Sequence, residues 1–169
     1  MSQSIPHSYT QPYIVIGALI VRSGKILLLQ ENHMPDKGKW NIPAGKLDYG
    51  EDPIDAVKRE VLEESGLTFR PRTILGMRSI YRKDVPGNVK TTHVLRIVFL
   101  GEASGDVSYD HGETGKDGLE ISDHKWLSPQ EVLSMPLSAL RYHDIKQCVH
   151  DYQSGKSYPL DLLTHIVQN

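Results

Sequence analysis

Apolar residues form two short runs near the beginning of the chain. Residues 13–22 (YIVIGALIVR) and 25–31 (KILLLQE) are rich in branched apolar side chains, and Ser23-Gly24 between them has the composition of a tight turn. This pattern predicts a β-hairpin that begins a sheet. The segment that follows is rich in Gly, Pro, Asn and Asp, so we expect a loop with a short strand near residues 40–42.

Helical spacing of apolar residues replaces the strand pattern at residues 52–66. Asp52 is a suitable N-cap, Pro53 suits the first helical position, and Gly66 is typical of the residue that ends a helix. The segment therefore predicts a helix with defined ends.

Strand patterns return at residues 73–82, 92–103 and 122–128, where β-branched and aromatic residues are frequent. A capping-box sequence at Ser128 predicts another helix start, and residues 139–152 predict a further amphipathic helix. The apolar side of that last helix is expected to contain Leu140, Ile145, Cys148 and Val149.

The order of predicted elements is strands, helix, strands, helices, without an internal repeat. With 169 residues, 38% hydrophobic and 24% charged, the chain fits one α/β domain over residues 1–169. We expect a flexible arm at residues 1–12, a long polar loop at 104–118, and a C-terminal helix and tail over 136–169.

The net charge of −2 argues against a strongly basic nucleic-acid-binding protein, so no stable nucleic-acid binding is expected. The single Cys148 cannot form an internal disulfide, and neither it nor the histidines have zinc-ligand spacing. No apolar run approaches the roughly 20 residues that span a bilayer. These observations predict a cytoplasmic protein without a membrane anchor.

The charges are distributed unevenly along the chain. Residues 45–66 carry seven acids and three bases, whereas residues 67–96 carry seven bases and one acid. An acidic helix followed by basic strands suits a site that holds a cation together with a polyphosphate.

Three acidic residues, Glu60, Glu63 and Glu64, share one side of the predicted helix, because positions i, i+3 and i+4 are neighbours. The expected core face is formed by Ile54, Val57 and Val61. Adjacent carboxylates repel one another unless a cation or an arginine offsets their charge, and Mg²⁺ or Mn²⁺ prefers such oxygen ligands. A solvated acidic surface is the alternative explanation for this face.

Residues 45–67 match the Nudix signature at every defined position. The matching residues are Gly45, Glu51, Arg59, Glu60, Val61, Glu63, Glu64, Gly66 and Leu67. The chain therefore resembles the MutT-like Nudix hydrolases. This resemblance implies an α/β/α sandwich with a mixed β-sheet, in which the signature forms a loop, a helix and a loop. It also implies Mg²⁺-dependent attack of water on a phosphoanhydride.

The resemblance also implies roles for individual residues. Glu60, Glu63 and Glu64 would be the metal ligands, together with the carbonyl oxygen of Gly45 or its neighbour. Arg59 would orient the carboxylates, since its planar fork can fix a carboxylate rotamer. The proton acceptor would be Glu63, Glu64 or, outside the signature, Glu120.

Two features bear on the substrate. Arg78, Arg82 and Arg96 lie on predicted strands and could pair with phosphate oxygens. Residues 151–163 resemble the tail of Nudix phosphatases that act on the thiamine-pyrimidine pyrophosphate and on nucleoside di- and triphosphates, and residues 136–145 resemble part of the 8-oxo-guanine nucleoside diphosphatases. Both resemblances imply release of a terminal phosphate from a small pyrophosphate.

The expected function is thus hydrolysis of phosphoanhydride bonds in nucleoside di- or triphosphates or similar small pyrophosphates. Nucleotide-sugar, dinucleoside polyphosphate and RNA-end pyrophosphatases are alternatives within the enzymes. A catalytically silent Nudix-fold module that binds a nucleotide is the alternative of another class, although the intact REVLEES sequence argues against it. Homodimers are frequent in the family, but no residue pattern here fixes an interface.

Overall fold

The protein is described by a computed structural model that covers residues 12–82, 92–108 and 120–168. Most of the predicted arm at 1–12 and of the predicted loop at 104–118 therefore lies outside the described residues. The elements, in chain order, are β1 (Tyr13–Arg22), β2 (Lys25–Glu31), β3 (Trp40–Asn41), β4 (Ala44–Lys46), α1 (Pro53–Ser65), β5 (Thr68–Arg82), β6 (Thr92–Ser104), β7 (Ile121–Leu127), α2 (Pro129–Ser134), η1 (Leu137–Ala139), α3 (Asp144–Gln153) and η2 (Leu160–Leu162).

The strands form one mixed sheet in the order β3-β2-β1-β6-β5, with β4 also paired to β1 and β7 to β2. Strand β1 is central: it runs parallel to β6 and antiparallel to β4, and its last residues pair antiparallel with β2. The sheet ends at β5, which pairs antiparallel with β6 along most of its length.

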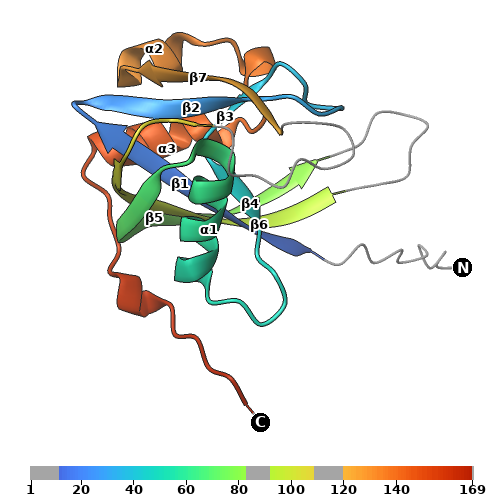
Figure 1. Ribbon diagram of the computed structural model, residues 1–169, viewed down its shortest axis with the longest axis vertical. Helices are drawn as coiled ribbons and strands as arrows, with labels where there is room; N and C mark the ends of the chain where they lie inside the picture. Colours follow the sequence, from blue (N-terminus) through green and yellow to red (C-terminus); the bar gives the residue numbers. More distant parts are fainter. Residues whose placement is uncertain (1–11, 83–91, 109–119, 169) are drawn as a thin grey trace, which may run out of the picture.

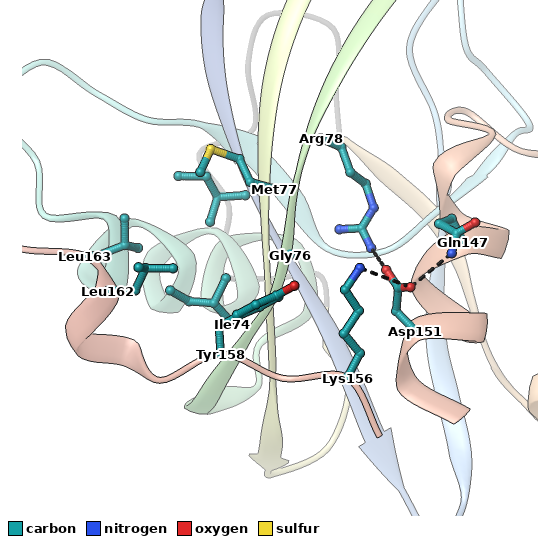
Figure 2. A pocket seen from close by; sticks show the side chains of 11 residues that line it. Ile74, Gly76, Met77, Arg78, Gln147, Asp151, Lys156, Tyr158, Leu162 and Leu163 are labelled. Carbon is teal, nitrogen blue, oxygen red and sulfur yellow. Dashed lines mark hydrogen bonds and ion pairs between the residues drawn. The ribbon is translucent and has the colours of Figure 1, made fainter. Parts of the chain in front are cut away.

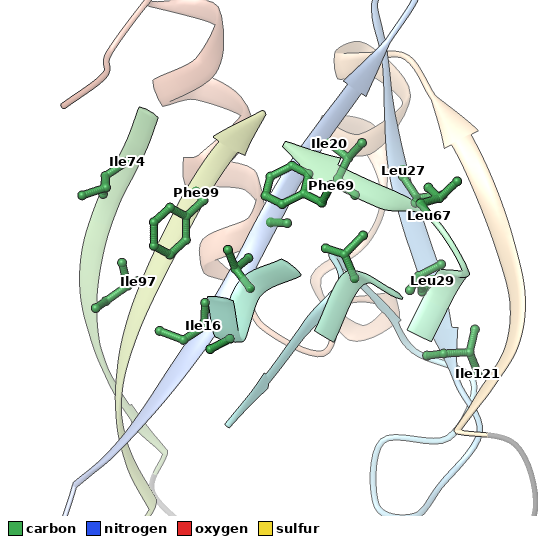
Figure 3. Packing of buried hydrophobic residues seen from close by; sticks show 14 residues of the cluster. Ile16, Ile20, Leu27, Leu29, Leu67, Phe69, Ile74, Ile97, Phe99 and Ile121 are labelled. Carbon is green, nitrogen blue, oxygen red and sulfur yellow. The ribbon is translucent and has the colours of Figure 1, made fainter. Parts of the chain in front are cut away.

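Helix α1 covers one face of the sheet, and α2 and α3 cover the other (Figure 1). Successive strand residues point to opposite faces, so Ile16, Ala18 and Ile20 of β1 pack toward α1 while Leu19 packs toward α3. Figure 3 shows the cluster on the α1 side, where Phe69 and Phe99 join the β1 and β2 side chains. The predicted α/β/α arrangement is confirmed.

Local signals set the ends of α1 as the sequence predicts. The Asp52 carboxylate accepts a hydrogen bond from the Ile54 N–H at 2.7 Å, and Pro53 occupies the first turn. Gly66 ends the helix in the left-handed conformation, with φ of 70°, and its N–H donates to the Leu62 carbonyl. No helix in the described part of the chain is long and apolar enough to cross a membrane.

The helix predicted over residues 139–152 begins later than expected. Residues 140–142 are not helical, because Leu140 forms a bridge with Trp40 and the Arg141 N–H donates to the Trp40 carbonyl at 2.9 Å. Helix α3 starts only at Asp144. Arg141 of this extended segment lines the pocket described below.

Candidate active site

Five glutamates from three parts of the chain meet at one pocket of about 350 Å³. The pocket, called the acid pocket below, is lined by Glu31, His33, Ala44, Gly45, Lys46, Glu60, Glu63, Glu64, Glu120 and Arg141. Helix α1 provides three of the glutamates, the end of β2 provides Glu31, and the residue before β7 provides Glu120. The structure thus brings together Gly45 and the four glutamates that the sequence analysis singled out.

Glu60 and Glu64 are buried rather than solvated, with 9% and 8% of their surfaces exposed. Strand β4 lies over both of them. The Ala44 N–H donates to Glu64 Oε2 at 2.9 Å, and the Glu60 carboxylate packs against Gly45, where a Cβ atom would overlap it. Gly45 is therefore required by close approach, and a solvated acidic face does not describe these two residues.

Arg59 holds three carboxylates of the signature in place. Its Nε and Nη2 donate to the two oxygens of Glu51 at 2.8 and 2.9 Å, and its Nη1 donates to Glu60 at 2.8 Å and Glu63 at 3.1 Å. Nη2 also reaches the Lys46 carbonyl at 3.2 Å. This planar fork fixes the rotamers of the pocket glutamates, and it lowers the pKa of Glu51 through the hydrogen bond with Arg59.

The crowding of carboxylates raises the pKa values of the buried pair. Burial raises the pKa of Glu60 to about 7 against the opposing effect of Arg59, and the charges of Glu63 and Glu120 add to the rise. Burial also raises the pKa of Glu64 well above its usual range, and the nearby Glu31 carboxylate contributes. A bound cation would offset both penalties.

The donor set suits a hard divalent cation, since five of the ten residues that line the pocket are glutamates. Within the described ranges, no three acidic, histidine or cysteine side chains are already arranged as a metal-binding group. Their present contacts explain this arrangement, because Glu60 and Glu63 are turned toward Arg59 and Glu64 toward the Ala44 N–H.

Glu120 lies at the exposed rim of the acid pocket. Its carbonyl accepts from the Asn32 N–H at 2.9 Å, which ties the start of β7 to the end of β2. The Glu120 side chain thus enters the pocket from a different element than the α1 glutamates.

Glu31 and Arg141 were missed by the sequence analysis. Arg141 Nη1 donates to Glu31 Oε1 at 2.6 Å, and Glu31 also accepts from Asn41 Nδ2 at 3.1 Å. A single acid at the end of an apolar strand, KILLLQE, was the available signal for Glu31. No local signal marked Arg141, because it meets Glu31 across 110 residues of sequence.

Of the strand arginines, the two whose side chains are described, Arg78 and Arg96, do not line the acid pocket. Arg96 is fully buried and donates to Asp144 Oδ1 at 3.0 Å and to Asn41 Oδ1 at 3.1 Å, on the α3 side of the sheet. It cannot reach a phosphate group in the acid pocket, which corrects the prediction. Arg78 faces the same side and lines another cavity (Figure 2). Arg82 pairs with Thr92 at the end of β5, and its side chain lies outside the described residues.

A mixed sheet between helices, with signature glutamates gathered at one pocket, is the arrangement expected of a phosphoanhydride hydrolase. A family model described as the NUDIX domain matches residues 11–148. The chain therefore belongs to the Nudix family.

Individual relatives agree with this assignment. The structure of a NUDIX hydrolase from Nitrosomonas europaea is 33% identical, with a TM-score of 0.76 over 92% of this chain and 98% of that chain. Phosphatase NudJ of Escherichia coli is 28% identical over 153 residues, which cover 90% of this chain and 91% of NudJ. The human 8-oxo-dGDP phosphatase NUDT18 is 29% identical over 89% of this chain, which spans only 42% of the human protein. These relatives place the chain among hydrolases that act on phosphorus-containing anhydrides.

Proposed function

We propose that the protein hydrolyses a phosphoanhydride bond of a nucleoside di- or triphosphate, or of a similar small pyrophosphate, at the acid pocket with Mg²⁺ or Mn²⁺. The observation that carries this proposal is the convergence of five glutamates with Lys46 and Arg141 on one pocket. Carboxylates outnumber bases there, so a polyphosphate could enter only with a cation that offsets their charge.

Glu60, Glu63 and Glu64 would hold the metal ion, together with the Gly45 carbonyl oxygen. When bound, the ion would neutralise phosphate oxygens and increase the nucleophilicity of water. Arg59 keeps the carboxylates near their working positions through the fork of hydrogen bonds with Glu51, Glu60 and Glu63.

Lys46 and Arg141 provide the positive charge of the pocket that can face a phosphate group. Arg141 is anchored by its 2.6 Å contact with Glu31, and its guanidinium lies 5.5 Å from the centroid of the Tyr142 ring. A guanidinium positioned in this way favours planar, bidentate contact with phosphate oxygens.

Glu120 is the proton acceptor that the geometry favours. Glu63 already accepts from Arg59, and Glu64 from the Ala44 N–H, whereas Glu120 reaches the pocket from its solvent-exposed rim. An exposed carboxylate at the rim can accept a proton from water and release it to solvent. Glu120→Gln should then lower kcat about 100-fold with little change in KM, measured in steady-state assays.

The names of two relatives support a narrower substrate class. Both are phosphatases, and the human protein acts on 8-oxo-dGDP. We therefore propose that the preferred substrate carries a diphosphate and that the product released is orthophosphate.

A substrate panel tests the proposal. Purified protein with Mg²⁺ is offered nucleoside diphosphates, nucleoside triphosphates, nucleotide sugars, dinucleoside polyphosphates and 5′-triphosphate RNA, and orthophosphate and pyrophosphate are measured separately. We expect metal-dependent orthophosphate release, fastest with a diphosphate. Binding of nucleotides without turnover of any compound would instead support a silent nucleotide-binding module.

A further inference from the structure

A second cavity of about 590 Å³ lies at the edge of the sheet, away from the acid pocket. It is bounded by β5, α3 and the segment after α3, and its two halves differ in character (Figure 2). The apolar half is formed by Ile74, Met77, Ile97, Leu162 and Leu163, and the polar half by Arg78, Gln147, Asp151 and Lys156. This volume is typical of pockets that hold small molecules.

The C-terminal segment builds one wall of this cavity. Tyr158 pairs with Ile74 of the edge strand β5 through two backbone hydrogen bonds of 2.8 Å. This pairing brings Lys156, Tyr158 and Leu162 to the same cavity. The tail that the sequence analysis singled out is therefore part of a cavity wall, and the acid pocket makes no use of it.

Bases exceed acids in the charge cluster beside the cavity. Asp144 is shared between Arg96 at 3.0 Å and Arg78 at 3.8 Å, and Asp151 is shared between Arg78 at 2.6 Å and Lys156 at 3.5 Å. Three cations thus face two carboxylates. Both arginines and both carboxylates are largely removed from water, whereas Lys156 is 44% exposed, and the one excess positive charge of the cluster favours an anion.

Among the described residues, two buried donors of this cluster, Arg78 Nη1 and Arg96 Nε, have no hydrogen-bond partner, and of these two arginines Arg78 lines the cavity. Arg78 Nη1 is buried and makes no hydrogen bond, while Nη2 of the same guanidinium donates to Asp151. Nη1 lies above Gly76, where a side chain would come within 3.2 Å of it, and Gly76 itself lines the cavity. An unpaired buried donor is costly, so an acceptor from a ligand would be stabilised there.

We propose that this cavity is a second ligand site, for an amphipathic organic carboxylate such as a medium-chain fatty acid. The carboxylate would pair with Arg78 and Lys156, and its alkyl chain would lie along Met77 and Leu162. A carboxylate suits the site better than a phosphate monoester, because a monoanion matches the single excess positive charge.

Direct binding to the metal-free protein tests this site without any dependence on hydrolysis. Decanoate, below its micellar concentration, is titrated by calorimetry in EDTA, with decanol and acetate as the neutral and the short probes. We expect one decanoate per chain, bound at least about tenfold more tightly than either probe. Equal binding of decanol, or no binding of decanoate, would overturn the proposal.

Two variants locate the bound molecule. Met77 is 55% exposed, so Met77→Glu leaves the core intact but places a carboxylate on the apolar wall, and it should weaken decanoate binding about tenfold or more. Met77→Leu should retain binding. Unchanged binding in Met77→Glu would place decanoate elsewhere and sink the proposal.

The second variant tests the charged half with a matched control. Lys156 and Lys58 have similarly exposed side chains, 44% and 47%, and each pairs with one aspartate. Lys156→Gln should weaken decanoate binding by about threefold to tenfold, whereas Lys58→Gln should not change it. Equal affinities in the two variants would contradict the role of Lys156.

Discussion

The two faces of the sheet use arginine in opposite ways. On the α1 side, Arg59 donates hydrogen bonds to Glu51, Glu60 and Glu63. Glu60 and Glu63 line the acid pocket together with three further glutamates, so acids are in excess. On the α3 side, Arg78 and Arg96 share Asp144, and Arg78 and Lys156 share Asp151, so bases are in excess. Each face is therefore suited to a ligand of the opposite charge.

This difference shows that charged segments adjacent in the sequence need not belong to one binding site. The acidic residues 45–66 and the basic residues 67–96 are adjacent in sequence, but the sheet separates Arg78 and Arg96 from the α1 glutamates. The alternation of side chains along β6 decides on which face Arg96 lies. Ile97 and Phe99 face α1, so Arg96 must face α3.

The largest expected effect is on stability, from the α3 face. Arg96→Leu leaves Asp144 and the Asn41 carbonyl without their buried donor, and we expect a loss of about 3–5 kcal/mol in the free energy of unfolding. Urea denaturation measures it. Arg72→Leu, which removes the exposed pair with Glu102, should cost less than about 1 kcal/mol.

The Arg96 prediction has an internal check. Arg96→Leu combined with Asp144→Leu removes both charges and should recover part of the lost stability. KM of the folded Arg96→Leu protein should stay near that of the wild type. A large rise in KM with unchanged stability would mean that Arg96 contacts the substrate after all.

The next largest expected effect is a loss of turnover, from a change in the acid pocket. Glu63 has a side chain that is 45% exposed, so Glu63→Gln should not disturb the fold, but it should lower kcat about 100-fold or more, since a metal ligand is lost. Asp55→Asn is the matched control, because Asp55 is an exposed acid of the same helix, paired with Lys58. Near-normal turnover of Glu63→Gln would remove Glu63 from the metal site.

The raised pKa of Glu60 predicts a pH dependence of stability. Its folded-state pKa of about 7 exceeds the ordinary value of 4.5, so the metal-free protein loses stability as the pH rises from about 4.5 to about 7. Glu60→Gln lacks this loss and should be more stable than the wild type at pH 8, by up to about 3 kcal/mol, and similar at pH 4.

Denaturation of both proteins in EDTA across this pH range measures the difference. Glu102→Gln, at an exposed acid outside α1 and the acid pocket, provides the background for removal of one carboxylate. Adding Mg²⁺ should reduce the advantage of Glu60→Gln at pH 8, because the ion offsets the charge of Glu60 in the wild type. A difference that does not vary with pH would exclude Glu60 as its source.

The sequence predicts local features of the fold well, since they depend on neighbouring residues. The Asp52 cap, the Gly66 stop and the β1–β2 hairpin follow from local chemistry and are confirmed. The start of α3 was wrong because residues 140–142 are held by Trp40, about 100 residues away in sequence. A local pattern typical of a helix cannot show that a contact with a residue distant in sequence holds the segment in an extended conformation instead.

In the candidate site, too, the features that depend on neighbouring residues could be predicted, and those that depend on distant segments could not. Its signature glutamates lie within a few residues of one another, so the spacing alone indicates a shared pocket. The contact between Glu31 and Arg141 requires β2 and the segment before α3 to meet, which no short pattern specifies. Likewise, alternation shows that Arg96 and Ile97 face opposite ways, but only the packed structure shows which face α1 covers.

The smallest effect tests how Arg59 works. Arg59→Lys keeps the positive charge but loses the fork that binds both Glu51 oxygens and reaches Glu60 and Glu63. If the fork positions the metal ligands, the apparent Mg²⁺ affinity should fall about tenfold, while kcat at saturating Mg²⁺ should change only a few-fold.

Initial rates over a range of Mg²⁺ concentrations separate the two quantities. Arg72→Lys is the control, because Arg72 makes one exposed contact with Glu102 on the edge of the sheet, and it should leave the Mg²⁺ dependence unchanged. An Arg59→Lys protein with the Mg²⁺ dependence of the wild type would show that charge alone suffices on the α1 face. The excess of carboxylates, rather than the geometry of the guanidinium, would then account for the Mg²⁺ dependence of this face.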